Sequence, residues 1–210
     1  MTHEQILADL KANKYATTYF LAGEETFYID LICDYIENNV LNDADKGFNQ
    51  TVMYGRDTET TSLVAAAKQF PMMANHTVII VKEAQDLKKI DLLKSYVDQP
   101  LESTLLVLCY RGKKLDKRKA LYKSVQKNGI YFESNKLYEN KIPEWIKGYL
   151  RSKDYSIGSK AAAILTEFLG NDLSKIAGEL NKLCILAPKK SEITEELIES
   201  NIGISKDYNN

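Results

Sequence analysis

The 210-residue chain is long enough for one large domain or two small ones with their own hydrophobic cores. Hydrophobic residues make up 44% of the chain and charged residues 27%, with a formal net charge of -1, which excludes a general electrostatic attraction to nucleic acid. No apolar run reaches the roughly 20 residues of a membrane span, and the cysteines lack zinc-site spacing, so we expect a cytoplasmic protein with buried, reduced thiols.

The first predicted strand, residues 18–22, leads through Gly23 into a long amphipathic helix. This order is typical of a phosphate-binding loop with the pattern G-x-x-x-x-G-K-[ST]. Counted from Gly23, the second Gly, the Lys and the Ser/Thr of that pattern fall on Tyr28, Ile29 and Asp30. No ammonium group is therefore available for the phosphates, and a carboxylate replaces the hydroxyl. The pattern indicates a nucleotide-binding scaffold without its nucleotide site.

Strand and helix patterns alternate up to about residue 135. Further strands are predicted at residues 50–54, 77–81, 104–109 and 130–132, and helices at residues 28–40, 59–70, 87–97 and 115–127. The third and fourth of these strands contain continuously apolar runs, residues 78–81 and 105–108, which are typical of strands covered on both faces. Repeated strand–helix units predict an α/β domain over residues 1–137, of the P-loop-NTPase-like (AAA+) kind, with a five-stranded, mainly parallel sheet and right-handed crossovers.

The pattern changes after about residue 137, where only helices separated by short turns are predicted. They cover Ile142–Arg151, residues 161–169, residues 173–184 and a short segment after Thr194, followed by a polar tail from Ser205. These segments predict a small all-helical lid domain over residues 138–210. An α/β P-loop-like domain followed by a helical lid is the plan of an AAA+ module.

The other signatures of nucleotide hydrolysis are missing. A Walker B motif places an acidic residue directly after an apolar strand to hold Mg²⁺, but Lys82 stands there. The only histidines, His3 and His76, lie in no metal-ligand or nucleophile motif. We therefore predict no catalytic residues, no metal and no cofactor. An atypical P-loop NTPase is the weakest alternative.

Phe70-Pro71-Met72-Met73 is the first of two candidate binding surfaces. Two adjacent methionines after a helix-stopping proline can project as a flexible apolar plug that fits a groove on a partner. A simpler interpretation is that the same residues close the bottom of the local core. The pattern does not decide between these interpretations.

The second candidate surface is basic. Residues 111–119 are the densest basic stretch of the chain and include Lys113, Lys114, Lys117 and Arg118. Contacts with phosphate groups need such clustering. A solvated helix face explains the stretch equally well, and DNA is not the only acidic partner that fits it. The two functions left open are a nucleic-acid-binding adaptor and a contact with another protein subunit.

Seven short segments, matched in order along nearly the whole chain, carry a family resemblance. They are residues 19–25, 70–73, 112–118, 145–150, 170–176, 179–183 and 202–205. Together they resemble the delta subunit of the bacterial DNA polymerase III clamp loader. The resemblance implies an AAA+-shaped subunit of a DNA-directed DNA polymerase complex that does not itself hydrolyse ATP, in agreement with the degenerate loop after Gly23.

The resemblance also implies partners and a contact site. Delta subunits bind the ring-shaped sliding clamp (the beta subunit) and help open it for loading onto primed DNA. They contact it through an apolar pair at the tip of the helix before the third strand, which matches Met72 and Met73 here, with Phe70 and Pro71 shaping the tip. Further expected partners are the tau/gamma and delta prime subunits. Family members continue into a C-terminal collar domain that joins the pentamer; these 210 residues stop before it, so clamp binding is expected to survive and pentamer assembly by this chain alone is not.

Overall fold

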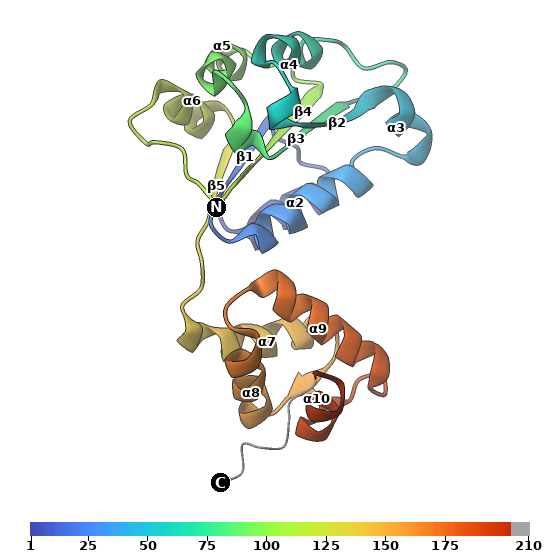
Figure 1. Ribbon diagram of the computed structural model, residues 1–210. Helices are drawn as coiled ribbons and strands as arrows, with labels where there is room; N and C mark the ends of the chain where they lie inside the picture. Colours follow the sequence, from blue (N-terminus) through green and yellow to red (C-terminus); the bar gives the residue numbers. More distant parts are fainter. Residues whose placement is uncertain (203–210) are drawn as a thin grey trace. The chain divides into compact units, whose positions relative to one another are not determined.

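The computed structural model describes residues 1–202 (Figure 1). The chain divides into two compact units, Met1–Asn135 and a second unit from Lys136 onward, each described here by itself. The predicted polar tail and most of the last matched segment, from Gly203, lie outside the described residues. Within residues 1–202, no helix is both long enough and apolar enough to cross a membrane.

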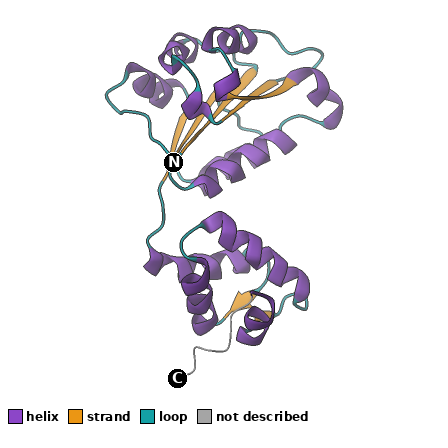
Figure 2. Ribbon diagram, viewed as in Figure 1, coloured by secondary structure: helices purple, strands orange, loops and turns teal. Residues whose placement is uncertain are grey.

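The first unit is built on a five-stranded parallel sheet with the strand order β2-β3-β4-β1-β5 (Figure 2). The strands are β1 (Thr18–Gly23), β2 (Gln50–Tyr54), β3 (Thr77–Lys82), β4 (Thr104–Arg111) and β5 (Ile130–Ser134). All five predicted strands are confirmed, with ends within two residues of those expected. Every neighbouring pair is parallel, so the carboxyl ends of all five strands lie at one edge of the sheet and the amino ends at the other.

Helices cover both faces of this sheet (Figure 1). α1 (His3–Lys11) and α2 (Thr26–Asn39) pack on one face; α4 (Thr60–Ala67), α5 (Lys94–Asp98) and α6 (Ala120–Asn128) pack on the other. Along β3, Val78 and Ile80 face α2, while Ile79 and Val81 face the opposite layer. Each fully buried aliphatic side chain contributes about 1.5–3 kcal/mol, and burial on both faces explains the continuous apolar runs in the middle of β3 and β4.

Two of the predicted helices begin later than their sequence patterns suggest. The pattern at 87–97 forms a 3-10 turn, η3 (Ile90–Leu93), and then α5, because Lys89 has a left-handed φ of 56°. The pattern at 115–127 becomes helical only at Ala120. Before it, Gly112 has a φ of 70° and the Asp116 carboxylate accepts a hydrogen bond from the Arg118 N–H at 2.9 Å, which stabilises a turn in place of a helix.

Several short elements have no counterpart in the sequence prediction. They are α1, α3 (Asp43–Asn49) and the 3-10 turns η1 (Gly55–Asp57), η2 (Ala84–Asp86) and η4 (Glu139–Lys141). The helix α3 has seven residues, too few for a clear helical period. Its start is stabilised by the Asn42 side chain, which accepts a hydrogen bond from the Asp45 N–H at 2.9 Å.

The second unit is helical, as expected. Its helices are α7 (Ile142–Arg151), α8 (Ser159–Leu169), α9 (Leu173–Leu186) and α10 (Glu195–Ile202). One addition is a parallel pair of two-residue strands, β6 (Ser156–Ile157) and β7 (Glu192–Ile193), which are too short to show an alternating pattern. Cys184 in α9 is half-buried rather than buried as expected, since it lies beside the exposed end of that helix.

Candidate functional site

The loop at the carboxyl end of β1 binds its own carboxylate where a nucleotide-binding protein would bind a phosphate. Glu25 is 4% exposed and is the N-cap of α2, with its Oε1 accepting a hydrogen bond from the Phe27 N–H at 3.0 Å. The N-terminus of a helix favours an anion because its N–H groups lack partners and its dipole end is positive. Glu25 supplies that anion from within the chain.

A cluster of charged side chains lies beside this loop. The Arg111 guanidinium, at the end of β4, bonds the Asp30 carboxylate of α2, and its Nη1 lies 3.4 Å from Glu83 Oε1. The Arg111 N–H also donates to Gln85 Oε1 at 3.0 Å. Burial raises the pKa of Asp30, although the Arg111 guanidinium opposes that effect. The sequence pattern had grouped Arg111 with the basic stretch; the structure places it in this cluster instead.

Lys82, at the Walker B position, also has an internal partner. Its Nζ lies 3.0 Å from Glu37 Oε2 on α2, and this hydrogen bond raises the pKa of Lys82. Among residues 1–202, Cys33, Asp34 and Glu37 place potential metal-ligand atoms within 4.8 Å of one another. The ammonium of Lys82 already compensates Glu37, however, and a hydrogen bond with Cys33, together with burial, raises the pKa of the Cys109 thiol well above its usual value. Because Glu37 is already ion-paired with Lys82, these groups do not form a convincing metal site.

Replacing Arg111 with alanine tests the structural role of this charged cluster. Because Arg111→Ala leaves Asp30 and Glu83 without their shared cation, we expect a loss of about 1–2 kcal/mol in the free energy of unfolding. The matched control is Arg56→Ala, which removes an exposed pair with Asp57 and should change stability by less than about 0.5 kcal/mol. Urea unfolding followed by circular dichroism measures both; equal losses in the two variants would contradict a structural role for the cluster.

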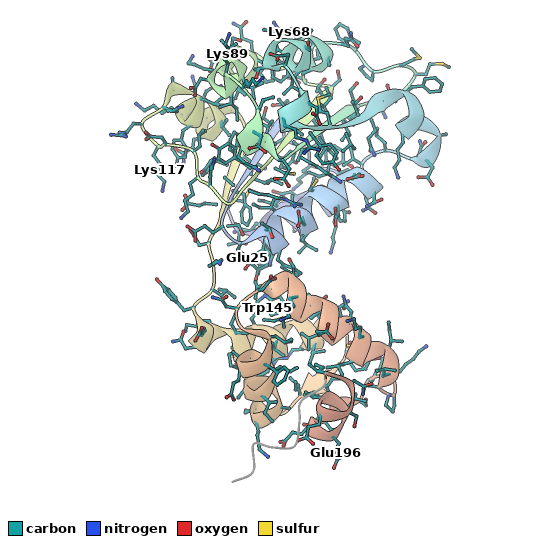
Figure 3. All side chains as sticks on the ribbon, in the orientation of Figure 1. Glu25, Lys68, Lys89, Lys117, Trp145 and Glu196 are labelled. Atoms are coloured by element: carbon teal, nitrogen blue, oxygen red, sulfur yellow. The ribbon has the colours of Figure 1, made fainter. Side chains whose placement is uncertain are left out.

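The methionine pair lies at the other edge of the same sheet, in what we call the tip loop, residues 70–76, between α4 and β3. Phe70 is 79% exposed, Met72 60% and Met73 98%. These side chains therefore do not close the core, which excludes that interpretation of the sequence pattern. In Figure 3, Lys68 marks the end of α4 where the loop begins, and Glu25 marks the opposite edge of the sheet. The tip loop and the degenerate phosphate loop thus lie at opposite edges because all the strands are parallel.

The backbone of the tip loop is held by a buried side chain from α3. Asn49 is 2% exposed; its Oδ1 accepts a hydrogen bond from the Met72 N–H at 2.6 Å, and its Nδ2 donates to the Met72 carbonyl at 3.0 Å. The next residue, Met73, has a left-handed φ of 54°. That conformation costs a residue with a side chain on the order of 1–3 kcal/mol and persists where surrounding contacts hold it. The exposed tip thus has a defined backbone conformation, which the hydrogen bonds of Asn49 stabilise.

The basic stretch is largely paired within the protein. Lys114 and Lys117 lie 2.9 Å and 3.4 Å from the carboxylate of Glu133, and Arg118 lies 2.9 Å from Asp116. Hydrogen bonds from Arg118 lower the pKa of Asp116 to about 2. Lys117 is labelled in Figure 3. These internal pairs reduce the positive charge that the stretch offers to a partner.

Lys113 and Lys119 complete the basic stretch. Lys113 is exposed, whereas Lys119 Nζ lies 2.8 Å from Asp91 Oδ2. Both Asp91 and Glu133 belong to segments distant in the sequence, so the pattern of residues 111–119 could not reveal this neutralisation.

The fold and the loop together define the class of protein. A five-stranded parallel sheet covered by helices, with a degenerate phosphate loop after β1 and a helical unit that follows in the sequence, is an AAA+-type P-loop fold. The chain belongs to the DNA polymerase III delta subunit family, whose family model matches residues 19–135.

Similarity to known proteins supports this assignment. The chain is 28% identical to the DNA polymerase III subunit delta of Bacillus subtilis, over 95% of this chain and 60% of that protein. Among solved structures, the Bacillus subtilis DNA clamp loader delta protein superimposes with a TM-score of 0.76 at 24% identity, over 96% of this chain and 62% of that one. A Thermotoga maritima protein related to the DNA polymerase III gamma subunit shares the fold with a TM-score of 0.50 at 13% identity, over 88% and 62% of the two chains. The chain thus spans less than two thirds of the length of these relatives.

Proposed function

We propose that this chain binds the sliding clamp as the delta subunit of a clamp loader and helps to open it for loading onto primed DNA. The observation that carries the proposal is the tip loop: in a member of the delta family, Phe70, Met72 and Met73 are presented to solvent on a backbone fixed by Asn49. Pro71 lies four positions after the last residue of α4, Ala67, and we propose that it helps to shape the tip. Exposed, rigidly held apolar side chains are typical of a protein-binding site.

The mechanism that we propose is differential binding. A ligand shifts an equilibrium only by the difference between its affinities for the two states. If the tip loop binds a distorted clamp protomer more tightly than a relaxed one, the excess binding free energy lowers the cost of opening the ring. A shift of about 1.4 kcal/mol changes the open-to-closed ratio tenfold.

We further propose that this chain has no ATPase activity of its own and acts in the cytoplasm. In support, Glu25 occupies the anion position at the start of α2, and Lys82 stands where a magnesium ligand would be needed. Energy from ATP would then come from other subunits of the complex, which we expect to be the tau/gamma subunits, with delta prime as a further partner. The role that we propose for this chain is therefore that of a binding surface.

A binding measurement with the clamp tests the proposal. The purified chain is passed over immobilised sliding clamp from the same genome by surface plasmon resonance, with and without Mg-ATP. We expect saturable binding that Mg-ATP does not alter. Absence of binding overturns the proposal. If the chain instead binds DNA with a strong salt dependence and ignores the clamp, an adaptor acting through Lys113, Lys114, Lys117 and Arg118 replaces it.

A further inference from the structure

An exposed aromatic side chain lies next to the residue that fixes the tip loop. Phe48, near the end of α3, is 77% exposed, whereas the adjacent Asn49 is 2% exposed and bonds the Met72 backbone. Successive residues of a helix point about 100° apart, so Asn49 reaches into the tip loop while Phe48 faces solvent beside it. Exposed apolar side chains from two segments that are tied together form a larger contact surface than either segment alone.

The sheet explains why these two segments meet. α3 runs directly into β2 at Gln50, and the tip loop runs into β3 at Thr77. β2 and β3 are parallel neighbours, with Gln50 opposite Val78. Both segments therefore lie at the amino edge of the sheet, on adjacent strands, and Asn49 bridges them. Figure 1 shows α3 and the loop after α4 side by side.

We propose that Phe48 and the tip loop form one docking surface for the sliding clamp, and that Asn49 is the positioning residue that holds the two parts together. This inference rests on the proposed function and extends the contact from the methionine pair of the tip loop to the aromatic ring of Phe48 on α3. The tip loop, residues 70–76, contains no Asp, Glu, Lys or Arg. The tip loop, together with the exposed Phe48 ring, consequently fits an apolar pocket on the clamp.

The chemistry of the bridge explains why this position carries an asparagine. A carboxamide accepts from the Met72 N–H and donates to the Met72 carbonyl at the same time. Aspartate keeps the acceptor but loses the donor, and alanine loses both. Because Met73 has a left-handed backbone next to this bridge, loss of the bridge allows the loop to relax and displaces the Met73 side chain.

Clamp affinities of single and combined variants test the surface. We expect Phe48→Ala and Asn49→Ala each to weaken binding about 5- to 20-fold, and Asn49→Asp to have an intermediate effect. In a chain that already carries Met72→Ala and Met73→Ala, Asn49→Ala should add less than about a twofold loss, because a positioning residue acts only through the side chains it positions. Amide exchange at Met72 should accelerate in Asn49→Ala and not in Phe48→Ala.

Two controls match the tested changes. Tyr138→Ala removes an aromatic residue that is 82% exposed in the second unit. Asn39→Ala removes an asparagine whose Nδ2 donates to the Tyr35 carbonyl at 2.9 Å on the surface of α2. Both should keep the affinity for the clamp within about twofold of the wild-type chain.

The outcomes separate this inference from the proposed function. If the wild-type chain does not bind the clamp, the proposed function and the extended docking surface are both overturned. If the wild-type chain binds and the double methionine variant does not, but Phe48→Ala and Asn49→Ala keep full affinity, only the extended surface is overturned. It is also overturned if sedimentation shows a dimer of this chain that Phe48→Ala dissociates, because a second copy would then occupy the surface.

Discussion

A chain carrying both Met72→Ala and Met73→Ala is expected to bind the sliding clamp at least about 30-fold more weakly than the wild-type chain, a loss of about 2 kcal/mol. Each substitution removes three heavy atoms from a side chain that is 60% or 98% exposed in the free protein. Full burial of each lost methylene-sized group would be worth about 0.8 kcal/mol, so the expected loss corresponds to partial burial of both side chains in the complex.

The chain contains a matched control for this pair. Ile185 and Leu186 are also adjacent and apolar, and are 83% and 56% exposed at the end of α9. Replacing both with alanine should leave the affinity for the clamp within about twofold, and neither double variant should lower the midpoint of thermal unfolding by more than a few degrees. The assigned contact is wrong if the methionine variant binds as tightly as the isoleucine–leucine variant.

Gly23→Ala is expected to lower the free energy of unfolding by about 3 kcal/mol or more. A Cβ at this position would lie 1.9 Å from the Ser134 carbonyl oxygen, and Gly23 has a φ of 139°, which side-chain-bearing residues rarely adopt. The atom in the way belongs to the backbone of β5, so β1 and β5 must separate at their carboxyl ends. That separation would also weaken the hydrogen bond from the Glu25 N–H to the Ser134 carbonyl, now 3.3 Å long.

Gly47→Ala is the control for this substitution. Gly47 lies within α3, and a Cβ there meets no atom within 4 Å. Alanine is favoured over glycine inside a helix by up to about 1 kcal/mol, so this variant should be as stable as the wild-type chain or slightly more stable. Urea unfolding followed by circular dichroism compares the two; a loss below about 1 kcal/mol in Gly23→Ala would contradict the close approach of β1 and β5.

Much of the fold could be predicted because local patterns specify it. The continuous apolar runs in β3 and β4 are visible without any structure, and the period of α7 matches its observed bounds, Ile142–Arg151. Short elements could not be predicted in this way. The helix α3 is too short to show a period, so neither Phe48 nor Asn49 was recognised as part of the candidate site. An exposed phenylalanine followed by asparagine carries no distinctive signal in a single sequence.

The sequence by itself determined that this chain has a P-loop-like scaffold with a degenerate phosphate loop. The residue at the lysine position of the motif is read directly from the sequence, and it is Ile29. Only the tertiary structure decided which internal group occupies the place of a bound phosphate, and which side chains the chain presents to partners. Arg111 joins Asp30 across 81 positions, Asn49 joins Met72 across 23, and Lys114 joins Glu133 across 19. Side chains so far apart in sequence meet because parallel strands bring the ends of successive strand–helix units to the same edge of the sheet. A local sequence pattern contains no information about such long-range contacts.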